Sequence, residues 1–171
     1  MIVYTILLFF TDGEMNMDKI LINAYAKINI TLDVLKRRTD GYHELEMIMQ
    51  SIDVFDSVEV RKTDRGEIRV FSDSSKVPED KTNIAYKAAE KMFDFCGIKS
   101  GVDIYINKRI PVAAGLAGGS ADGAAVIKAI RALFVPNENI EKFNSLAGSI
   151  GKDLPFCLKN GTAFAYGLGD E

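Results

Sequence analysis

A glycine- and alanine-rich segment in the second half of the chain, PVAAGLAGGSADGAA (residues 111–125), limits the possible fold most strongly. It follows an alternating apolar stretch typical of a strand, Val102 to Ile106. It precedes Ala124 to Phe134, which is apolar nearly all round and predicts a largely buried helix. We therefore expect a strand, a glycine turn, and a helix that begins near Gly119 or Ser120.

The rest of the chain predicts strands first and helices later. The β-rich stretches run from Lys19 to Lys36, Leu45 to Val54, Ser57 to Arg61 and Glu67 to Phe71. Helical spacing appears in Asn83 to Cys96, with Gly97 as its C-terminal cap, and in Ile140 to Ile150. Several strands without intervening helices favour an α+β fold, in which a mixed, mostly antiparallel sheet packs against helices.

Length and composition exclude several classes of protein. The 171 residues predict one domain, or one domain and a fragment. A net charge of −3 argues against a broad cationic surface for nucleic acid or anionic lipid. With two distant cysteines, Cys96 and Cys157, and one histidine, we expect no disulfide framework and no metal site. Both thiols are expected to be reduced and buried, as in a cytoplasmic protein.

The first ten residues, Met1 to Phe10, form an apolar run about half as long as a bilayer span requires. They lack the basic start and the cleavage site of a secretory signal. Three interpretations compete: an extra strand, a weak membrane anchor, or upstream sequence included through an early start codon. We favour the last, with Met17 as the start, and rank the strand second.

The glycine turn itself has two interpretations. Glycines let a ligand approach the backbone, and the free N–H groups at a helix N-terminus favour phosphate, to which Ser120 adds a hydroxyl. Alternatively, the small residues let the helix pack closely on the sheet. The segment is neither a Walker loop, because no Gly-Lys-Ser/Thr follows, nor a dinucleotide fingerprint, because its spacing is Gly-x-x-Gly-Gly. Composition alone leaves both interpretations open.

Four further positions stand out, each with an ordinary alternative. Lys27 is a lone cation in an apolar strand, where it either needs a counter-charge or simply points to solvent. His43 follows Tyr42 in a polar loop, Asp40 to Leu45, which otherwise is a surface turn with an incidental imidazole. Asn83 precedes a helix and is expected at least to cap it. Asp153 stands between a helix end and a strand-like apolar segment, where an acid is usually a cap or turn residue.

Together these segments resemble the GHMP kinase superfamily. The resemblance rests on AKIN (residues 26–29) and on PVAAGLAGGSADGAA, and it runs from about residue 20 onward. Two more segments narrow it: RRTDGYHELE (residues 37–46) and GKDLPFCLKNGTAFAYGLGDE (residues 151–171). They are similar to the branch that phosphorylates the erythritol 2-hydroxyl of 4-diphosphocytidyl-2-C-methyl-D-erythritol.

The resemblance implies a ribosomal protein S5 domain 2-like fold and ATP-dependent phosphoryl transfer with Mg²⁺ in isoprenoid precursor synthesis. It implies a small-molecule substrate as partner, with no nucleic acid and no membrane, and leaves a homodimer open. By matching positions, it implies that Lys27 and Asp153 are catalytic and that Asn29, Tyr42 and His43 bind the substrate. Because Lys27 and Asp153 are each a charge in an apolar neighbourhood, we also expect their side chains to lie together on one wall of the cleft that holds the glycine turn. The positions that match the ATP site are Asn83, Lys108, Pro111, Ala114, Gly115, Leu116, Ala117, Gly118, Gly119 and Ser120.

Two departures limit the resemblance. Ala117 and Ala121 replace a glycine and a serine of the commoner family loop; Ala117 costs only a methyl group if its dihedral angles are ordinary. Family members also continue into a C-terminal domain that closes the cleft, and we expect residues 18–171 to be the N-terminal domain, residues 1–17 an extension, and the interdomain face to be exposed. A non-catalytic nucleotide-binding or structural remnant is the alternative, and an RNA-binding domain is disfavoured by the charge.

Overall fold

The longest strand, β2 (His43–Thr63), lies in the middle of the sheet in the computed structural model, which describes residues 17–37, 41 and 43–167. On one side β2 pairs with β1 (Lys19–Arg37) along most of its length, antiparallel. On the other side, two shorter antiparallel strands share it: β4 (Gly101–Asn107) at one end and β5 (Thr162–Gly167) at the other. The strand β3 (Ile68–Ser72) runs parallel to β4. The expected mixed, mostly antiparallel sheet is confirmed.

The structure has one strand where the sequence predicted two. The stretches Leu45 to Val54 and Ser57 to Arg61 were expected as separate strands, but both belong to β2. The charged residue between them, Asp56, looks like a break, yet it is fully buried within the continuous strand. Its carboxylate is satisfied by tertiary partners, which sequence spacing does not reveal.

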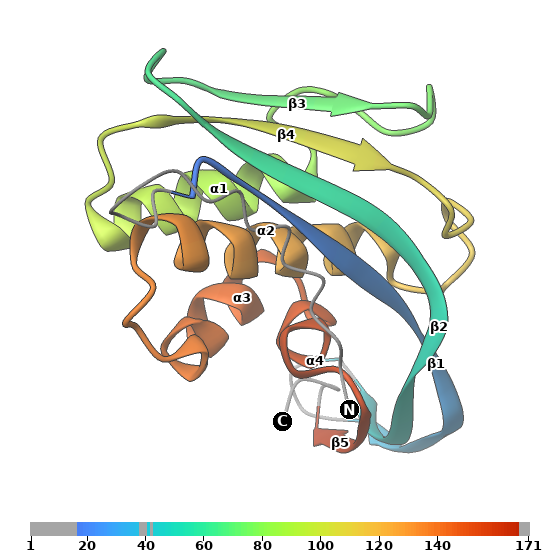
Figure 1. Cartoon of the computed structure of the whole chain (residues 1–171). Helices are drawn as coiled ribbons and strands as arrows, with labels where there is room; N and C mark the ends of the chain where they lie inside the picture. The colour runs from blue at the N-terminus through green and yellow to red at the C-terminus, as the bar shows by residue number, and fades with distance from the viewer. Residues whose placement is uncertain (1–16, 38–40, 42, 168–171) are drawn as a thin grey trace.

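The helices cover one face of the sheet (Figure 1). The first, α1 (Ile84–Cys96), has the expected caps: the Asn83 side chain accepts a hydrogen bond from the Ala85 amide, and Gly97 adopts the left-handed conformation at φ 66°. The second, α2 (Gly118–Phe134), packs against both α1 and β1. The first helix was predicted from its periodicity, and the second from an apolar stretch that follows the glycine turn.

Two later helices differ from prediction. The segment Ile140 to Ile150 is not one helix but a 3-10 turn, η1 (Ile140–Phe143), followed by α3 (Asn144–Ile150). The Lys142 amide donates to the Asn139 carbonyl in the tighter i to i+3 pattern, so the first turn is not α-helical.

The segment after Asp153 was expected to be strand-like but is a short helix, α4 (Leu154–Lys159). Pro155 lies in its first turn, where proline favours a helix start. A short apolar run has no periodicity that separates a strand from a helix buried on several sides.

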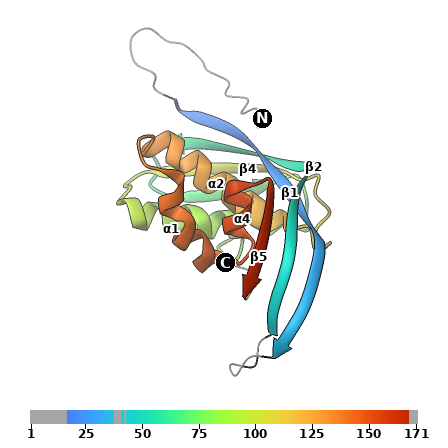
Figure 2. The same ribbon diagram turned by 90° about the horizontal axis from the view of Figure 1, so that it is seen from below.

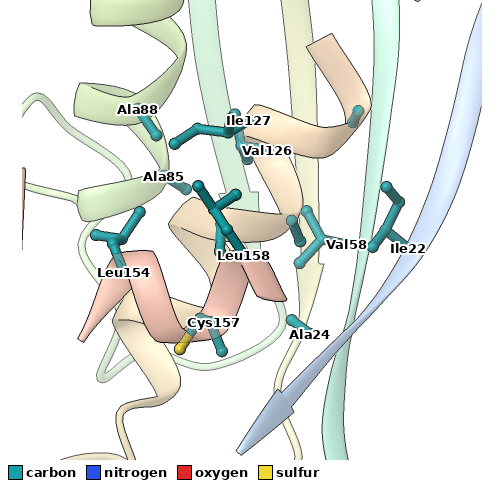
Figure 3. Packing of buried hydrophobic residues seen from close by; sticks show 14 of the residues in the cluster. Ile22, Ala24, Val58, Ala85, Ala88, Val126, Ile127, Leu154, Cys157 and Leu158 are labelled. Atoms are coloured by element: carbon teal, nitrogen blue, oxygen red, sulfur yellow. The ribbon is translucent and has the colours of Figure 1, made fainter. Parts of the chain in front are cut away.

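The sheet and the helices share one hydrophobic core (Figure 3). It holds β-strand residues Ile22, Ala24 and Val58 together with helix residues Ala85, Ala88, Val126, Ile127, Leu154 and Leu158. Cys157 on α4 is part of this core, and burial raises the pKa of its thiol to about 12. Cys96 is only partly buried, and both thiols are free.

Beyond the helices, β1 and β2 continue as a long arm with β5 beside it (Figure 2). Large apolar side chains are exposed along this part: Ile28, Ile30, Leu32, Val34, Leu35, Phe164 and Tyr166. The run Met1 to Phe10 lies outside the described residues. Within the described ranges, no helix is long and apolar enough to cross a membrane.

Candidate active site

A cavity of about 380 Å³ opens between the glycine-rich loop, the start of α2 and the segment that leads into α1. Every position matched above to the ATP site lines it, from Asn83 and Lys108 through Pro111 to the loop residues 114–120. Lys76, Val77 and Pro78 close another part of its wall. Segments that lie far apart in the sequence therefore meet around one cavity.

The glycine-rich loop reaches α2 in a left-handed conformation. Gly115 has φ 75°, and Ala113 and Ala117 have φ 61° and φ 57°. Among the described residues no side chain caps α2, which begins at Gly118, one residue ahead of the expected start. The first amides of this helix therefore keep their hydrogen-bonding capacity for an anion.

The dihedral angles of Ala117 are not ordinary, so its replacement of a glycine costs more than a methyl group. A side chain at φ 57° is in the left-handed region, which costs about 1–2 kcal/mol for a residue with a Cβ. The replacement of a family glycine by Ala117 therefore stores strain at the entry to α2.

Close packing also explains some of the glycines. A methyl group added to Gly123 would lie 2.8 Å from Ile84 Cγ2, and one added to Gly119 would lie 3.2 Å from Ile84 Cδ1. Because Gly119 and Gly123 lack such methyl groups, α1 and α2 can approach closely. The two interpretations of the segment are thus compatible: its helical glycines serve packing, and its loop leaves the helix N-terminus open.

Lys27 and Asp153, which were expected to lie together, form an ion pair. Lys27 Nζ lies 3.3 Å from Asp153 Oδ1, and it also donates to Asn29 Oδ1 at 2.9 Å. The side chain of Lys27 is 7% exposed, whereas that of Asp153 is 37% exposed. The alternative of a solvent-facing lysine is therefore wrong, and the pair joins a buried cation to an accessible carboxylate.

The local backbone explains how this pair forms. The register of β1 and β2 shifts between Tyr25 and Lys27, so that the consecutive residues Ala26 and Lys27 are both buried. The Lys27 amide donates to the Leu116 carbonyl at 3.1 Å, which joins β1 directly to the glycine-rich loop. Asp153 occupies the N-cap position of α4 but accepts no capping hydrogen bond. Its carboxylate faces Lys27 instead, beside the cavity rather than in its lining.

Lys108 lines the cavity, but its ammonium group is occupied. Lys108 Nζ donates to Asp56 Oδ2 at 2.5 Å and to Asp122 Oδ2 at 2.8 Å. Burial alone would lower the pKa of Lys108, but the two carboxylates hold it above its ordinary value. Its charge therefore belongs to a buried cluster at the base of the loop.

Asn83 is similarly committed. Its Oδ1 caps α1 through the Ala85 amide at 2.8 Å, and its Nδ2 donates to the Pro78 carbonyl at 2.6 Å. It lines the cavity while holding the cavity wall together.

The residues that the resemblance assigns to the substrate separate into two groups. Asn29 lies beside the Lys27–Asp153 pair, whereas His43 is exposed at the start of β2, at the end of the arm. Tyr42 lies outside the described residues. The structure thus brings together the pair, Asn29 and the loop, and leaves His43 apart from them.

Comparison with known proteins agrees with this arrangement. Residues 83–166 match a family model described as the GHMP kinases N terminal domain. The chain carries a GHMP kinase N-terminal domain. The segment matched includes the loop, α2 and Asp153, but Lys27 precedes it.

Over the aligned residues, similar curated proteins are about 50% identical to this chain. A 4-diphosphocytidyl-2-C-methyl-D-erythritol kinase of Clostridium acetobutylicum is 51% identical over 150 residues, which cover 88% of this chain and 53% of the relative. A protein of the same description from Clostridium tetani is 47% identical, with the same coverage. The chain spans about half the length of the curated relatives it matches.

Solved structures agree on the fold. A crystal structure of 4-(cytidine 5'-diphospho)-2C-methyl-D-erythritol kinase matches with a TM-score of 0.77 at 35% identity, covering 88% of this chain and 53% of that one. A crystal structure of homoserine kinase from Cytophaga hutchinsonii shares the fold, with a TM-score of 0.62 at 22% identity. The match covers 89% of this chain and 44% of the homoserine kinase chain. The predicted ribosomal protein S5 domain 2-like fold of this GHMP kinase domain is confirmed.

One buried charge of the domain was missed from the sequence. Asp56 gave no signal beyond being an acid between two strand-like stretches. Asp122, the single carboxylate of the glycine-rich segment, was visible but had no assigned partner. Recognising their connection needs the register of β2 against β4, which aligns Ser57 with Asn107, next to Lys108.

Proposed function

We propose that this chain is an N-terminal part of a 4-diphosphocytidyl-2-C-methyl-D-erythritol kinase. The reaction transfers the γ-phosphoryl group of ATP to the 2-hydroxyl of 4-diphosphocytidyl-2-C-methyl-D-erythritol, in the non-mevalonate route to isoprenoid precursors, in the cytoplasm. The observation that carries the proposal is the Lys27–Asp153 pair, tied through the Lys27 amide to a glycine-rich loop over a cavity. Relatives with this description at about half identity support it.

Asp153 has the properties needed to orient the reacting hydroxyl. Its carboxylate is partly exposed, so a substrate can reach it, and the ammonium group of Lys27 lies 3.3 Å from its Oδ1. A carboxylate in hydrogen-bond contact with a hydroxyl can accept its proton as the hydroxyl attacks phosphorus. The buried lysine beside it supplies positive charge where negative charge develops on the transferred phosphoryl group.

The loop supplies the phosphate site. The uncapped amides at the start of α2, the helix dipole and the Ser120 hydroxyl favour the polyphosphate of ATP. These donors are fixed by the fold before the ligand binds, so little reorganisation is required at the moment of transfer. The wall from Lys76 to Asn83 leaves room for the nucleoside.

Mg²⁺ belongs to the proposal through ATP. The described residues contain no group of three or more His, Cys, Asp or Glu side chains that could hold a metal. A magnesium ion carried by the phosphate oxygens keeps several waters and needs only one or two protein ligands. When bound, the ion neutralises charge on the phosphates.

We assign Asn29, Tyr42 and His43 to the cytidine-bearing substrate, with Asn29 nearest to the reacting groups. Because the chain spans about half the length of its relatives, the whole reaction also requires what their other half supplies. We propose residues 18–171 as the N-terminal domain. The substrate is a small molecule, and the proposal involves no nucleic acid.

The test compares two proteins: this chain alone, and a fusion of this chain with the C-terminal half of the Clostridium acetobutylicum relative. Each is incubated with Mg-ATP and 4-diphosphocytidyl-2-C-methyl-D-erythritol, and the phosphorylated product is measured by ³¹P NMR. We expect product from the fusion and ATP binding by both. ATP binding without any product from the fusion would favour the alternative, a non-catalytic nucleotide-binding remnant.

A further inference from the structure

Three charged side chains meet beneath the first turn of α2 and take no part in the proposed chemistry. Asp56 comes from β2, Lys108 follows β4, and Asp122 lies on α2. Their side chains are 0%, 7% and 4% exposed. Lys108 donates to both carboxylates, so two negative charges share one positive charge away from water. With both acids ionised, the cluster keeps one uncompensated buried charge.

The two carboxylates are bound unequally. Asp56 Oδ1 accepts hydrogen bonds from the Arg109 and Ile110 amides at 2.5 and 2.8 Å, in addition to the bond from Lys108 to its Oδ2. Asp122 Oδ2 accepts from Lys108, but Asp122 Oδ1 is buried and has no hydrogen-bond partner among the described residues. A proton on Asp122 Oδ1 would remove the excess charge without costing Asp56 any of its donors.

The electrostatic surroundings of Asp122 favour that proton. Burial raises the pKa of Asp122, Lys108 lowers it and Asp56 raises it, and together they bring it to about 7. Burial has this effect because a carboxylate loses the hydration that stabilises its charge. The acid can therefore change its protonation near neutral pH.

The cluster also touches the loop. A methyl group added to Gly118, the first residue of α2, would lie 3.3 Å from Lys108 Nζ. Both Lys108 and Asp122 line the cavity. An anion held by the first amides of α2 therefore brings negative charge close to Asp122, and like charges favour protonation of the carboxylate.

We propose that Asp56, Lys108 and Asp122 are positioning residues for the glycine-rich loop, and that anion binding at this loop is coupled to uptake of one proton by Asp122. This inference rests on the proposed function, because it takes the polyphosphate of ATP as the anion. It has a direct consequence: ATP binds more weakly as the pH rises through neutrality, because a deprotonated Asp122 opposes the phosphates.

Other titratable groups around α2 do not replace Asp122 in this role. The helix α1 meets this end of α2 through the apolar Ile84. On the side of α2 that faces α4 and β1, Lys27, Lys128 and Asp153 lie close enough to the Cys157 thiol to influence its pKa. Lys76 lines the cavity on its far wall.

The first experiment needs no nucleotide. Aspartate carboxyl carbons of the 171-residue chain are labelled with ¹³C and followed by NMR from pH 4 to 9. We expect one carboxyl to titrate between pH 6 and 8, and to disappear from the spectra of Asp122→Asn. The matched control is Asp103→Asn, which changes a buried aspartate paired with Arg69 on the other face of the sheet. Titration of every carboxyl below pH 6 would overturn the inference.

The second experiment measures protons during ATP binding. Calorimetry at pH 7.5 in two buffers of different ionisation enthalpy counts the protons taken up by the wild-type chain, Asp122→Asn and Asp103→Asn. We expect uptake by the wild type and Asp103→Asn to exceed that of Asp122→Asn. The dissociation constant of the wild type should also rise with pH relative to Asp122→Asn, by at most about tenfold per pH unit for one proton.

Equal proton uptake in all three proteins, with ATP bound, would overturn the coupling but leave the proposed function intact. Absence of ATP binding in all of them would overturn the proposed function and the coupling together. The presence or absence of ATP binding distinguishes the two failures. The carboxyl titration tests Asp122 independently of both, because it uses no nucleotide. Asp122→Asn is close to isosteric, and even if that variant does not fold, titration of every carboxyl of the wild-type chain below pH 6 would overturn the inference.

Discussion

Two buried lysines flank the glycine-rich loop, and their partners differ. Lys27 and Lys108 are equally buried, with side chains 7% exposed in both cases. Lys27 pairs with one carboxylate, Asp153, which remains partly open to solvent. Lys108 pairs with two, Asp56 and Asp122, which are both sealed inside the domain.

The difference indicates which pair is available for chemistry. A ligand can reach Asp153 without opening the core, so the Lys27 pair can exchange its contacts for contacts with a substrate. The Lys108 cluster joins β2, the end of β4 and α2, so breaking it disturbs the support of the loop. We therefore expect substitutions at the first pair to affect turnover, and substitutions at the second to affect stability and pH dependence.

The largest expected effect is on turnover at the accessible pair. In the active fusion, Asp153→Ala should lower kcat by about 10²–10⁴-fold, the usual contribution of a positioned proton acceptor, with little change in ATP affinity. Lys27→Ala should also lower kcat, and the double variant should lose less than the product of the two effects, because the residues are in contact. Steady-state kinetics and calorimetry with ATP measure these quantities.

Near-normal turnover in Asp153→Ala would contradict the proton-acceptor role and leave only positioning to the pair. Asp103→Asn is a suitable control, because its carboxylate is paired with Arg69 outside the cavity. Its turnover should match that of the unmodified fusion.

The second prediction concerns stability at the sealed cluster. Lys108→Met leaves Asp56 and Asp122 buried without their shared cation, and loss of one member of a buried ion pair typically costs about 3–5 kcal/mol. Lys27→Met should cost about 1 kcal/mol or less, because its partly exposed partner regains hydration. Urea unfolding of the 171-residue chain measures both. Equal losses would remove the proposed distinction between the two lysines.

Sequence reasoning identified the accessible pair but not the sealed cluster. Lys27 and Asp153 were recognisable because each is a charge in an apolar neighbourhood with a family counterpart, and their pairing was predicted on chemical grounds. Lys108 was assigned to the ATP site, whereas in the structure its ammonium group donates to the carboxylates of Asp56 and Asp122. The partners of a buried charge depend on strand register and helix packing, which a single sequence does not specify.

The elements show the same division. Asn83 and Gly97 cap the two ends of α1 as expected, because local backbone chemistry determines helix caps. The continuity of β2 and the helical state of α4 were missed, because tertiary packing outweighs local patterns in both. The conformation of Ala117 was missed for another reason: alanine is rarely left-handed, and only the path of the loop into α2 requires it.

The third prediction uses pH to separate the two sites further. The pKa of Asp122 is raised from 3.8 to about 7, so the folded chain binds a proton that the unfolded chain releases between these values. Relative to Asp122→Asn, the wild type should therefore lose stability as the pH rises from 4 to 7, by up to about 1.4 kcal/mol per pH unit, and show no further loss above that range. Thermal unfolding across this range tests the sign. A wild type that gains stability over the range relative to Asp122→Asn would contradict it.

The smallest expected effect compares the two alanines that depart from the family loop. Ala117 is left-handed at the entry to α2, whereas Ala121 lies buried within the helix. Ala117→Gly should stabilise the chain by about 0.5–1 kcal/mol, because relief of the left-handed strain exceeds the entropy that glycine adds to the unfolded chain. Ala121→Gly should destabilise it by about 1 kcal/mol, since glycine is less favourable than alanine inside a helix. Urea unfolding of both variants measures the opposite signs. Destabilisation by Ala117→Gly would mean that the methyl group packs favourably enough to offset its backbone strain, so that the alanine contributes to holding the loop.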